Sequence, residues 1–394
     1  MWNTTELLRR LLADARVPCE VVLPSGETLY GGTAPAFRVT IRSSRALRGG
    51  LDEFSLGKAY VEGDIDIEGD MLSLLDVRAR LADRRRLLPL LRLCSTLFLR
   101  PATSINRRVV SDHYSFGDDF YLTFMDSRYR LYSHGHFESG DETIEQASER
   151  KLARVYETLQ LKPGMRLLDI GAGWGGVTEY CGTRGVHVTS LTLGDDSFRY
   201  IQALIRRHAL PGEVLLQDFL THRPGEPYDA IVILGVIEHI PYYRRFAEQV
   251  WACLRPGGLL YLDGSATREK FDMSRFTRHY IWHGTHTFMC LQDVLQELLY
   301  AGMEVRRLRQ ERHDYYLSMR QWAQRFDANR ERVIARWGEG LYRAWRVYLW
   351  GACHAFHNDI LQAYQLVALR GPAPGPRPGL GRRVSHFVRG LASR

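Results

Sequence analysis

Cysteine is scarce in this sequence, and its spacing does not suggest a disulfide framework. The six cysteines among 394 residues stand singly, without a Cys-x-x-Cys pair or a zinc-type His/Cys spacing, so we expect neither disulfides nor a bound metal. No stretch approaches the roughly 18 consecutive apolar residues that a membrane span requires. The segment Met1–Glu6 also lacks the basic start of a secretion signal. We therefore expect a cytoplasmic protein.

The composition is that of a globular protein. With 45% apolar and 25% charged residues, the chain can bury a core for one large domain and a smaller one. The formal net charge of +8 favours an anionic partner, and both nucleic acid and acidic lipid fit this description. Charge alone does not choose between them.

Four segments of the chain differ in their residue pattern. Residues 1–75 alternate short apolar runs with turn signals, which predicts a small N-terminal accessory domain of the α+β type. Arginines and leucines are interleaved over residues 76–110 and predict a basic helical connector, either a membrane-surface helix or a linker helix packed on the protein. Residues 111–370 form the predicted main domain. The Gly/Pro-rich start of residues 371–394 predicts a flexible basic tail.

The main domain has the rhythm of an α/β fold. Apolar, strand-like runs alternate with longer helical stretches, as expected for a doubly wound parallel sheet. An aromatic-rich helical stretch is predicted from about residue 317 to residue 369. The strand-like runs cover residues 166–170, 186–193, 213–216, 230–234 and 259–262.

A glycine motif follows the first of these strands. The run Gly171-Ala172-Gly173-Trp174-Gly175-Gly176 has Gly-x-Gly-x-x-Gly spacing, and glycines there let a backbone loop approach a nucleotide. A dinucleotide dehydrogenase would place an acidic residue at the end of the next strand to bind the ribose. That strand ends Leu191-Thr192-Leu193-Gly194 instead, with acidic residues only afterwards. Together with Asp169 in the first strand and Asp218 after a later one, this favours a methyltransferase.

Several ordered segments together resemble the family of cyclopropane-fatty-acyl-phospholipid synthases and mycolic acid methyltransferases. The resemblance extends from about His113 to Leu369, and residues 56–63 also resemble the accessory domain of longer bacterial members. It implies a Rossmann-like class I methyltransferase fold, S-adenosylmethionine as methyl donor and an unsaturated acyl chain of membrane phospholipid as acceptor. Besides the glycine motif, the matching segments are residues 113–120, 131–133, 159–165, 238–240 and 359–365.

The resemblance also assigns cofactor contacts by position. Asp169, on the strand before the glycine motif, joins the predicted cofactor site. Ser197 stands where the family commonly has glutamine, so one ribose contact differs. The contacts that the resemblance implies fall on Tyr132, Ser133, Gly171, Gly173, Thr192, Leu193, Gln217 and Asp218.

The chemistry of such an enzyme sets the requirements of its active site. Methyl transfer to a carbon–carbon double bond leaves a carbocation, so the site needs buried negative charge and the exclusion of water. A base must then remove a proton. Loss from the new methyl group closes a cyclopropane, and loss from an adjacent carbon leaves a methyl-branched or methylene product. The resemblance implies that ring-closing members use bicarbonate as this base, held by a cysteine, a glutamate, a histidine and a tyrosine.

This sequence keeps part of that catalytic set. Glu238 aligns with the family glutamate, whereas His134 replaces the cysteine and Asp263 replaces the histidine. The tyrosine aligns with His313, with the tyrosine pair 315–316 as the alternative. We hypothesise that the Asp263 carboxylate takes the place of bicarbonate, and that Glu238, His134 and His313 orient it or relay the proton. The binding of bicarbonate itself stays open.

Two other functions fit the same residues. The acceptor could be another apolar olefin, such as an isoprenoid or polyketide intermediate, or the chain could be a catalytically silent lipid-binding protein. If the acceptor is a membrane lipid, the positive charge predicts a peripheral protein at the anionic inner face of the membrane, without a nucleic acid partner. A homodimer, the acyl chain length and the double-bond position stay open.

Overall fold

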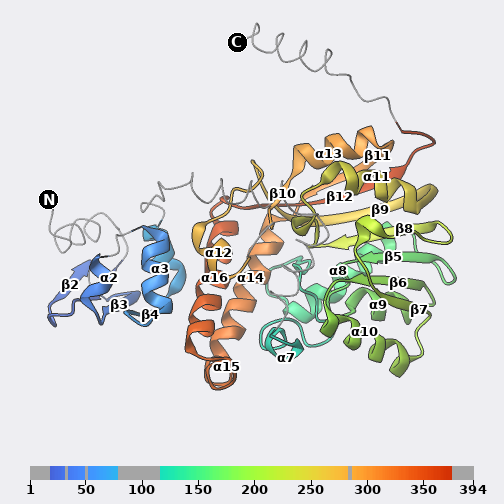
Figure 1. Cartoon of the computed structure of the whole chain (residues 1–394). Helices are drawn as coiled ribbons and strands as arrows, with labels where there is room; N and C mark the ends of the chain where they lie inside the picture. Colours follow the sequence, from blue (N-terminus) through green and yellow to red (C-terminus); the bar gives the residue numbers. More distant parts are fainter. Residues whose placement is uncertain (1–17, 32–33, 49–51, 79–115, 283–285, 375–394) are drawn as a thin grey trace, which may run out of the picture.

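The structure, a computed structural model, describes most of the chain. Most of the predicted basic connector, residues 79–110, lies outside the described residues, as does the predicted tail beyond residue 374. The described residues are 18–31, 34–48, 52–78, 116–282 and 286–374 (Figure 1).

The N-terminal part is an α+β unit with its own core. Its elements are β1 (Cys19–Val22), β2 (Thr28–Gly31), β3 (Phe37–Ile41), α2 (Ser44–Arg48), α3 (Glu53–Val61), β4 (Ile65–Gly69) and α4 (Met71–Arg78). The strands pair in the order β2-β1-β3-β4. Apolar side chains of the sheet, among them Val21, Phe37 and Ile65, pack with Ala59 of α3. Because Asp52 accepts a hydrogen bond from the Ser55 amide, it caps α3 at its first turn.

The main sheet has eight strands of mixed direction. They are β5 (Arg166–Ile170), β6 (His187–Thr192), β7 (Gly212–Leu216), β8 (Tyr228–Leu234), β9 (Leu254–Thr267), β10 (Met289–Cys290), β11 (Met303–Gln310) and β12 (Gln362–Arg370). Their order is β11-β12-β9-β8-β5-β6-β7, and β10 pairs with β9. From β9 to β7 the neighbours run parallel, whereas β12 runs antiparallel to β9 and β11. The predicted α/β fold is therefore confirmed.

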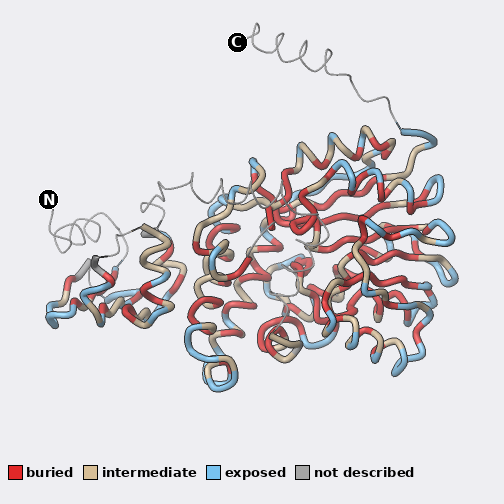
Figure 2. The backbone as a smooth tube through the Cα atoms, viewed as in Figure 1, coloured by how far each residue is buried: buried red, intermediate tan, exposed pale blue. Residues whose placement is uncertain are grey.

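Helices cover both faces of the main sheet (Figure 1), and its central strands β5, β6, β8 and β9 are buried along most of their length (Figure 2), whereas β7 and β11 are largely exposed or half-buried. The helices are α8 (Ile144–Thr158), α9 (Gly176–Gly182), α10 (Asp195–His208), α11 (Tyr243–Cys253) and α13 (Leu291–Tyr300). Leu167 of β5 packs in one cluster with Val155 of α8, and its neighbour Leu168 packs in another with Val250 of α11. Because both faces are buried, the parallel strands are nearly continuous apolar runs, which made them visible in the sequence.

The C-terminal segment differs from the prediction in its last part. It forms α14 (Arg312–Ala328), α15 (Arg330–Trp337) and α16 (Glu339–His357). The helical stretch predicted to residue 369 therefore ends at His357, and residues 362–370 form β12 instead. In β12, Leu366 joins the apolar cluster on one face of the sheet and Val367 the cluster on the other. A strand buried on both faces has no alternating pattern, so periodicity cannot separate it from a buried helix.

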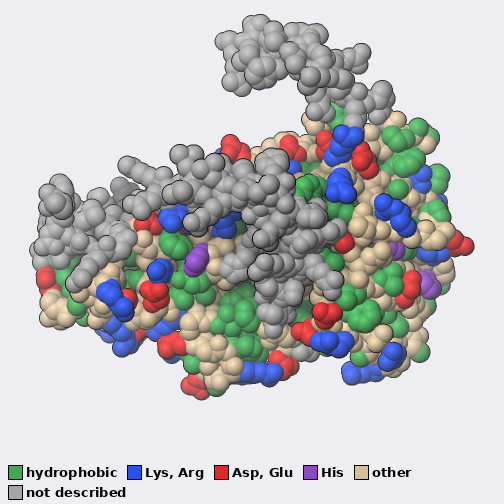
Figure 3. Space-filling model, in the orientation of Figure 1, with side chains coloured by type: hydrophobic (Ala, Val, Ile, Leu, Met, Phe, Trp, Pro, Cys, Tyr) green, Lys and Arg blue, Asp and Glu red, His purple; other side chains and the backbone are tan. Residues whose placement is uncertain are grey.

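The described surface carries charges of both signs. Lysine and arginine side chains are interspersed with aspartate and glutamate on the face shown in Figure 3.

Among the described helices, none combines the length and the apolar character needed to cross a bilayer.

Contacts from α16 hold the N-terminal unit. Arg343 is buried at this junction, and its guanidinium donates hydrogen bonds to the carbonyl oxygens of Tyr60 and Ile65, at 3.0 and 2.9 Å. The same group pairs with Asp66 of β4 and with Glu339 one helical turn away. One arginine therefore satisfies polar groups from both parts of the chain.

Replacement of Arg343 with methionine should destabilise the protein by about 3 kcal/mol, because it leaves buried carbonyl groups and the Asp66 carboxylate without this partner. Urea unfolding would measure the loss. Arg336→Met is the matched control, since Arg336 is 56% exposed and pairs with Asp119; its cost should stay below about 0.5 kcal/mol. Equal losses for the two variants would contradict this role of Arg343.

Candidate functional site

A pocket opens where the parallel strands β5, β6, β7 and β8 end. In an open α/β sheet, ligands bind outside this carboxyl edge. The space between its atoms, including the open mouth, is about 730 Å³. Most of the predicted cofactor residues line it, namely Gly171, Gly173, Thr192, Leu193, Gln217 and Asp218. The wall also includes Trp174, Ser197, Val236, His239 and Ile240.

The glycine loop forms one side of this pocket. Gly171 has a φ of +73°, and a Cβ atom there would lie 2.5 Å from the Val236 side chain. Gly175 begins α9 in the left-handed conformation. The Ser197 hydroxyl donates a hydrogen bond to the Gly173 carbonyl oxygen, so Ser197 supports the loop from α10. Within the loop, the amides of Gly171 and Ala172 donate to the Leu191 carbonyl oxygen, and the missing side chains of the glycines allow a ligand to approach the backbone.

The two predicted aspartates differ in their position. Asp218 lines the pocket, caps η1 (Phe219–Thr221) through the Leu220 amide at 2.7 Å, and keeps its Oδ2 without a partner among the described residues. A free acceptor in this mainly apolar pocket fits an N–H group of a nucleoside. Asp169 lies on β5 and is absent from the pocket wall; burial raises its pKa to about 7.

Tyr132 and Ser133 are also absent from the wall of this pocket. The Tyr132 ring stacks on Trp322 of α14, with the ring centroids 5.6 Å apart. The Ser133 hydroxyl accepts a hydrogen bond from Lys151 of α8 at 3.0 Å. The segment that carries both residues lies instead beside a second group of side chains, which is buried next to the pocket.

Glu238 connects the pocket to this second group. It lies in η2 (Ile237–His239), and its neighbours Val236, His239 and Ile240 form part of the pocket wall. Its Oε1 accepts hydrogen bonds from the Ser265 amide and hydroxyl, at 2.7 and 2.6 Å. Its Oε2 is buried without a partner among the described residues.

Burial decides the protonation of the Glu238 carboxyl group. It raises the pKa of Glu238 to about 7, and the hydrogen bonds from Ser265 oppose this shift only in part. The chain approaches the group closely at Gly264, where a Cβ atom would lie 3.2 Å from both carboxylate oxygens. Glu238 is therefore a candidate proton acceptor at neutral pH.

Asp263 of β9 is fully buried, with both carboxylate oxygens engaged. Its Oδ1 accepts a hydrogen bond from the Gly235 amide at 3.1 Å. Its Oδ2 lies 2.9 Å from Nζ of Lys151, an ion pair without hydrogen-bond geometry. Sequence reasoning missed Lys151. The available signal was a charged residue in line with Ala147 and Val155, on the face that α8 buries.

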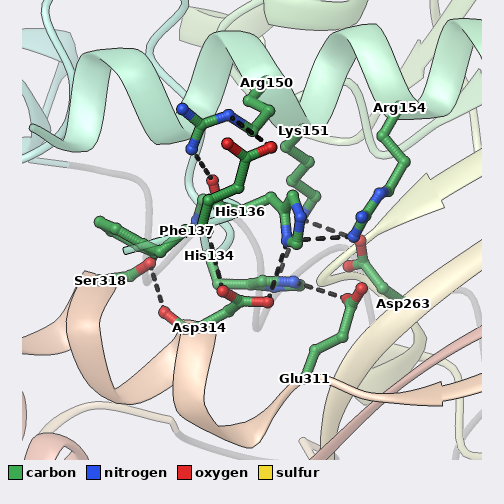
Figure 4. Close-up of polar contacts among 12 residues, drawn as sticks. His134, His136, Phe137, Arg150, Lys151, Arg154, Asp263, Glu311, Asp314 and Ser318 are labelled. Carbon is green, nitrogen blue, oxygen red and sulfur yellow. Dashed lines mark hydrogen bonds and ion pairs between the residues drawn. The ribbon is translucent and has the colours of Figure 1, made fainter. Parts of the chain in front are cut away.

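His134 completes the buried cluster (Figure 4). Its Nε2 lies 2.8 Å from Glu311 Oε2, and its Nδ1 lies 3.3 Å from Lys151 Nζ. The ring stacks on Tyr315, with centroids 4.3 Å apart. Burial acts to raise the pKa of Glu311, but the hydrogen bond and the electrostatic interactions with His134 and Lys151 outweigh burial and lower that pKa. Glu311 is a second residue that sequence reasoning missed.

The structure corrects the predicted position of His313. Its side chain is exposed on α14, and its ring lies 5.7 Å from that of Tyr316. Successive residues of a helix point about 100° apart. His313 and Tyr315 are two positions apart, so their side chains point in nearly opposite directions and cannot both face the cluster. Tyr315, one of the two tyrosines named as alternatives, is the residue that reaches it, between His134 and Phe356.

A metal ion is a further possibility to weigh at this cluster. His134, Asp263 and Glu311 offer ligand atoms that lie within 4.8 Å of one another. The ammonium group of Lys151 lies against two of these residues, Asp263 and His134. Because a metal cation would meet this positive charge, the geometry favours Lys151 as the cation of the cluster.

Comparison with known proteins agrees with the fold. The family profile described as mycolic acid cyclopropane synthetase matches residues 102–366. The Escherichia coli cyclopropane-fatty-acyl-phospholipid synthase is 27% identical over 376 residues, covering 92% of this chain and 95% of that protein. The Candida albicans sphingolipid C9-methyltransferase is also 27% identical, over 330 residues and 78% of this chain. This chain spans only 64% of the length of that fungal protein.

Solved structures show the same similarity. The cyclopropane synthase MmaA2 from Mycobacterium tuberculosis superposes with a TM-score of 0.62 at 27% identity, covering 67% of this chain and 98% of that one. The mycolic acid cyclopropane synthase CmaA1, complexed with SAH and CTAB, gives 0.62 at 26% identity, with 67% and 98% covered. The fold is therefore that of class I methyltransferases.

Replacement of Gly171 with alanine should weaken binding of S-adenosylhomocysteine at least tenfold, about 1.4 kcal/mol, because the new Cβ would strike Val236 and displace the loop. Isothermal titration calorimetry would measure this. Gly164→Ala is the matched control, since Gly164 also has a positive φ of +84° but has no atoms within 4 Å of the place that a Cβ atom would take. Its effect should be confined to stability, and equal losses of affinity would contradict the role of Gly171.

Proposed function

This chain belongs to the mycolic acid cyclopropane synthetase family of S-adenosylmethionine-dependent methyltransferases, and from that premise we propose a reaction and a substrate class. The proposed enzyme adds the methyl carbon of S-adenosylmethionine to the double bond of an unsaturated acyl chain in membrane phospholipid. The observation that carries the proposal is the unpartnered, buried Oε2 of Glu238 beside the pocket.

The residues of the pocket fit the cofactor. The glycine loop lets the cofactor approach the backbone closely, and the free Oδ2 of Asp218 can accept a hydrogen bond from the adenine amino group. His239 is also in the wall, and burial lowers its pKa to about 4, so it adds no positive charge near a sulfonium ion. When bound there, S-adenosylmethionine supplies an electrophilic methyl group.

Two buried carboxylates suit the charge that develops on the substrate. In the proposed transfer, the electrons of the double bond would form one carbon–carbon bond to the methyl group while the methyl–sulfur bond breaks. S-adenosylhomocysteine would leave with that electron pair, and a cation would remain on the neighbouring carbon. Glu238 and Asp263 provide negative charge in a site that excludes water, where an electrostatic interaction is stronger than in solvent.

Glu238 is the better placed of the two as the base. Both oxygens of Asp263 are engaged, by Gly235 and Lys151, whereas Glu238 keeps one oxygen free. We therefore move the role of base from Asp263 to Glu238. The proton passes to Oε2 of Glu238 while the electrons of the broken C–H bond form the new bond: a ring bond from the new methyl group, or a double bond from an adjacent carbon.

We propose that the enzyme acts at a membrane surface. An acyl substrate in phospholipid must be reached from a bilayer surface, and the net charge of +8 attracts anionic headgroups. Relatives named cyclopropane-fatty-acyl-phospholipid synthase and sphingolipid C9-methyltransferase support a lipid acceptor and differ in the lipid. We propose phospholipid, at the inner face of the membrane.

Mass spectrometry of lipids from a host that expresses the protein tests the reaction. The host receives methyl-labelled methionine and unsaturated phospholipids. We expect a phospholipid with one added labelled carbon, and fragmentation would distinguish a ring, a methylene group and a methyl branch. Label only in sphingolipid or in a non-lipid olefin would correct the substrate class. No labelled product, despite measured cofactor binding, would contradict the proposed reaction.

The variant Glu238→Gln should lower methyl transfer by about 100-fold or more, because glutamine keeps an acceptor for Ser265 but cannot take a proton. Cofactor affinity should stay close to that of the unmodified protein. Glu226→Gln, at an exposed carboxylate paired with Arg166, is the control and should leave the rate unchanged. A rate close to normal in Glu238→Gln would contradict this choice of base.

The same assignment predicts the pH dependence of the reaction. Since the pKa of Glu238 is raised to about 7 by burial, its reactive carboxylate form is lost as the pH falls through that value. The methyl-transfer rate should drop about tenfold per pH unit below it. Asp263 also acts to raise this pKa. The other titratable neighbours are tyrosines whose pKa values burial raises, Tyr243, Tyr315 and Tyr348.

A further inference from the structure

A buried lysine requires a physical reason. The side chain of Lys151 is only 2% exposed, and transfer of an ammonium group out of water costs several kcal/mol unless partners replace the water. Lys151 projects from the buried face of α8, between Ala147 and Val155. The proposed reaction has so far given this charge no role.

Three acceptors surround the ammonium group of Lys151. They are Asp263 Oδ2 at 2.9 Å, Ser133 Oγ at 3.0 Å and His134 Nδ1 at 3.3 Å. An ammonium group has N–H donors and no acceptor, so Ser133 and His134 accept hydrogen bonds from it, whereas Asp263 is its ion-pair partner without hydrogen-bond geometry. His134 therefore carries no proton on Nδ1 and donates its Nε2 proton to Glu311. Lys151 and Glu311 together set the tautomer of His134.

The charges of the cluster do not cancel. With His134 neutral, the positive charge of Lys151 faces the two carboxylates of Asp263 and Glu311, which leaves one excess negative charge. Asp263 can remain an anion at 0% exposure because Lys151 lies beside it. Asp263 is also close to Glu238: Gly264 follows it directly, and the Gly264 Cβ position lies 3.2 Å from both oxygens of Glu238.

We propose that Lys151 is a positioning residue of the methyl-transfer site, which holds Asp263 as a fixed anion beside Glu238 and helps to set the tautomer of His134. The fixed anion stabilises the cation formed on the substrate, and Glu238 remains free to take the proton. The catalytic part of this inference depends on the proposed function. The tautomer of His134 does not.

Three variants separate this role from a merely structural one. Lys151→Met leaves Asp263 unpaired and should lower the melting temperature by about 5 °C or more. The double variant Lys151→Met/Asp263→Asn removes both charges and keeps both shapes, so its melting temperature should recover to within about 2 °C of the unmodified protein. Lys162→Met, at an exposed lysine, is the control for loss of a positive charge.

In the double variant, kcat for phospholipid methylation should fall about 100-fold, while KM and the affinity for S-adenosylhomocysteine change by less than about threefold. A kcat within about threefold of normal would overturn the proposed role in catalysis. Lys162→Met should match the unmodified protein in every measurement.

Long-range ¹H–¹⁵N spectra of His134, assigned with a His134→Gln variant, give a readout that needs no lipid. In the unmodified protein, Nε2 should carry the proton and Nδ1 should not. In Lys151→Met/Asp263→Asn, Glu311 still accepts from Nε2 but no ammonium group donates to Nδ1, so Nδ1 should become able to carry a proton as well. A proton on Nδ1 of the unmodified protein would overturn the inference, whatever the substrate. If the spectra agree but no lipid is methylated, the positioning by Lys151 stands and the proposed reaction fails.

Discussion

Lys151 and Asp263 form an ion pair that is almost completely removed from water. Such a pair is tolerated only where further polar groups complete it, because desolvation of two charges costs more than a loosely arranged contact returns. The completing groups come from separate places: Ser133 and His134 from the loop before α8, the Gly235 amide from the end of β8 and Glu311 from the start of α14. The ion pair therefore requires α8, the sheet and the C-terminal helices to be packed together before the site exists.

The 3₁₀ turn η2 separates two environments with different tasks. On one side is the glycine-walled pocket, with apolar surface and a single free carboxylate oxygen on Asp218. On the other is the buried charge cluster. Glu238, the proposed base, lies in the turn itself, and its neighbours Val236, His239 and Ile240 line the pocket. This arrangement places the electrophile and the negative charge close together without putting the charge in the cofactor pocket.

The C-terminal part of the chain packs on the sheet and also positions residues of the buried charge cluster. β12 is inserted between β9 and β11, so it holds β9, and with it Asp263, from the side opposite to β8. Glu311 and Tyr315 follow β11, and both contact His134. In the sequence, Glu311 comes 177 positions after His134. Through Arg343, α16 also joins the N-terminal unit to this framework.

Local chemistry of the chain was enough to predict the central strands and the glycine loop, because burial on both faces and the geometry of the loop impose patterns on neighbouring residues. Glu238, His134 and Asp263 were singled out by the family resemblance instead. The partners of those side chains were decided by tertiary structure. His134 and Glu311 are 177 positions apart, and no local pattern links them. The same limit explains His313 and β12: the start of α14 sets which residue faces the cluster, and a fully buried strand has no periodicity of its own. The sequence by itself determined which groups are present at the edge of the sheet, and only the packing of α8 and α14 decided which charges meet there, since the cost of burying a charge depends on what surrounds it.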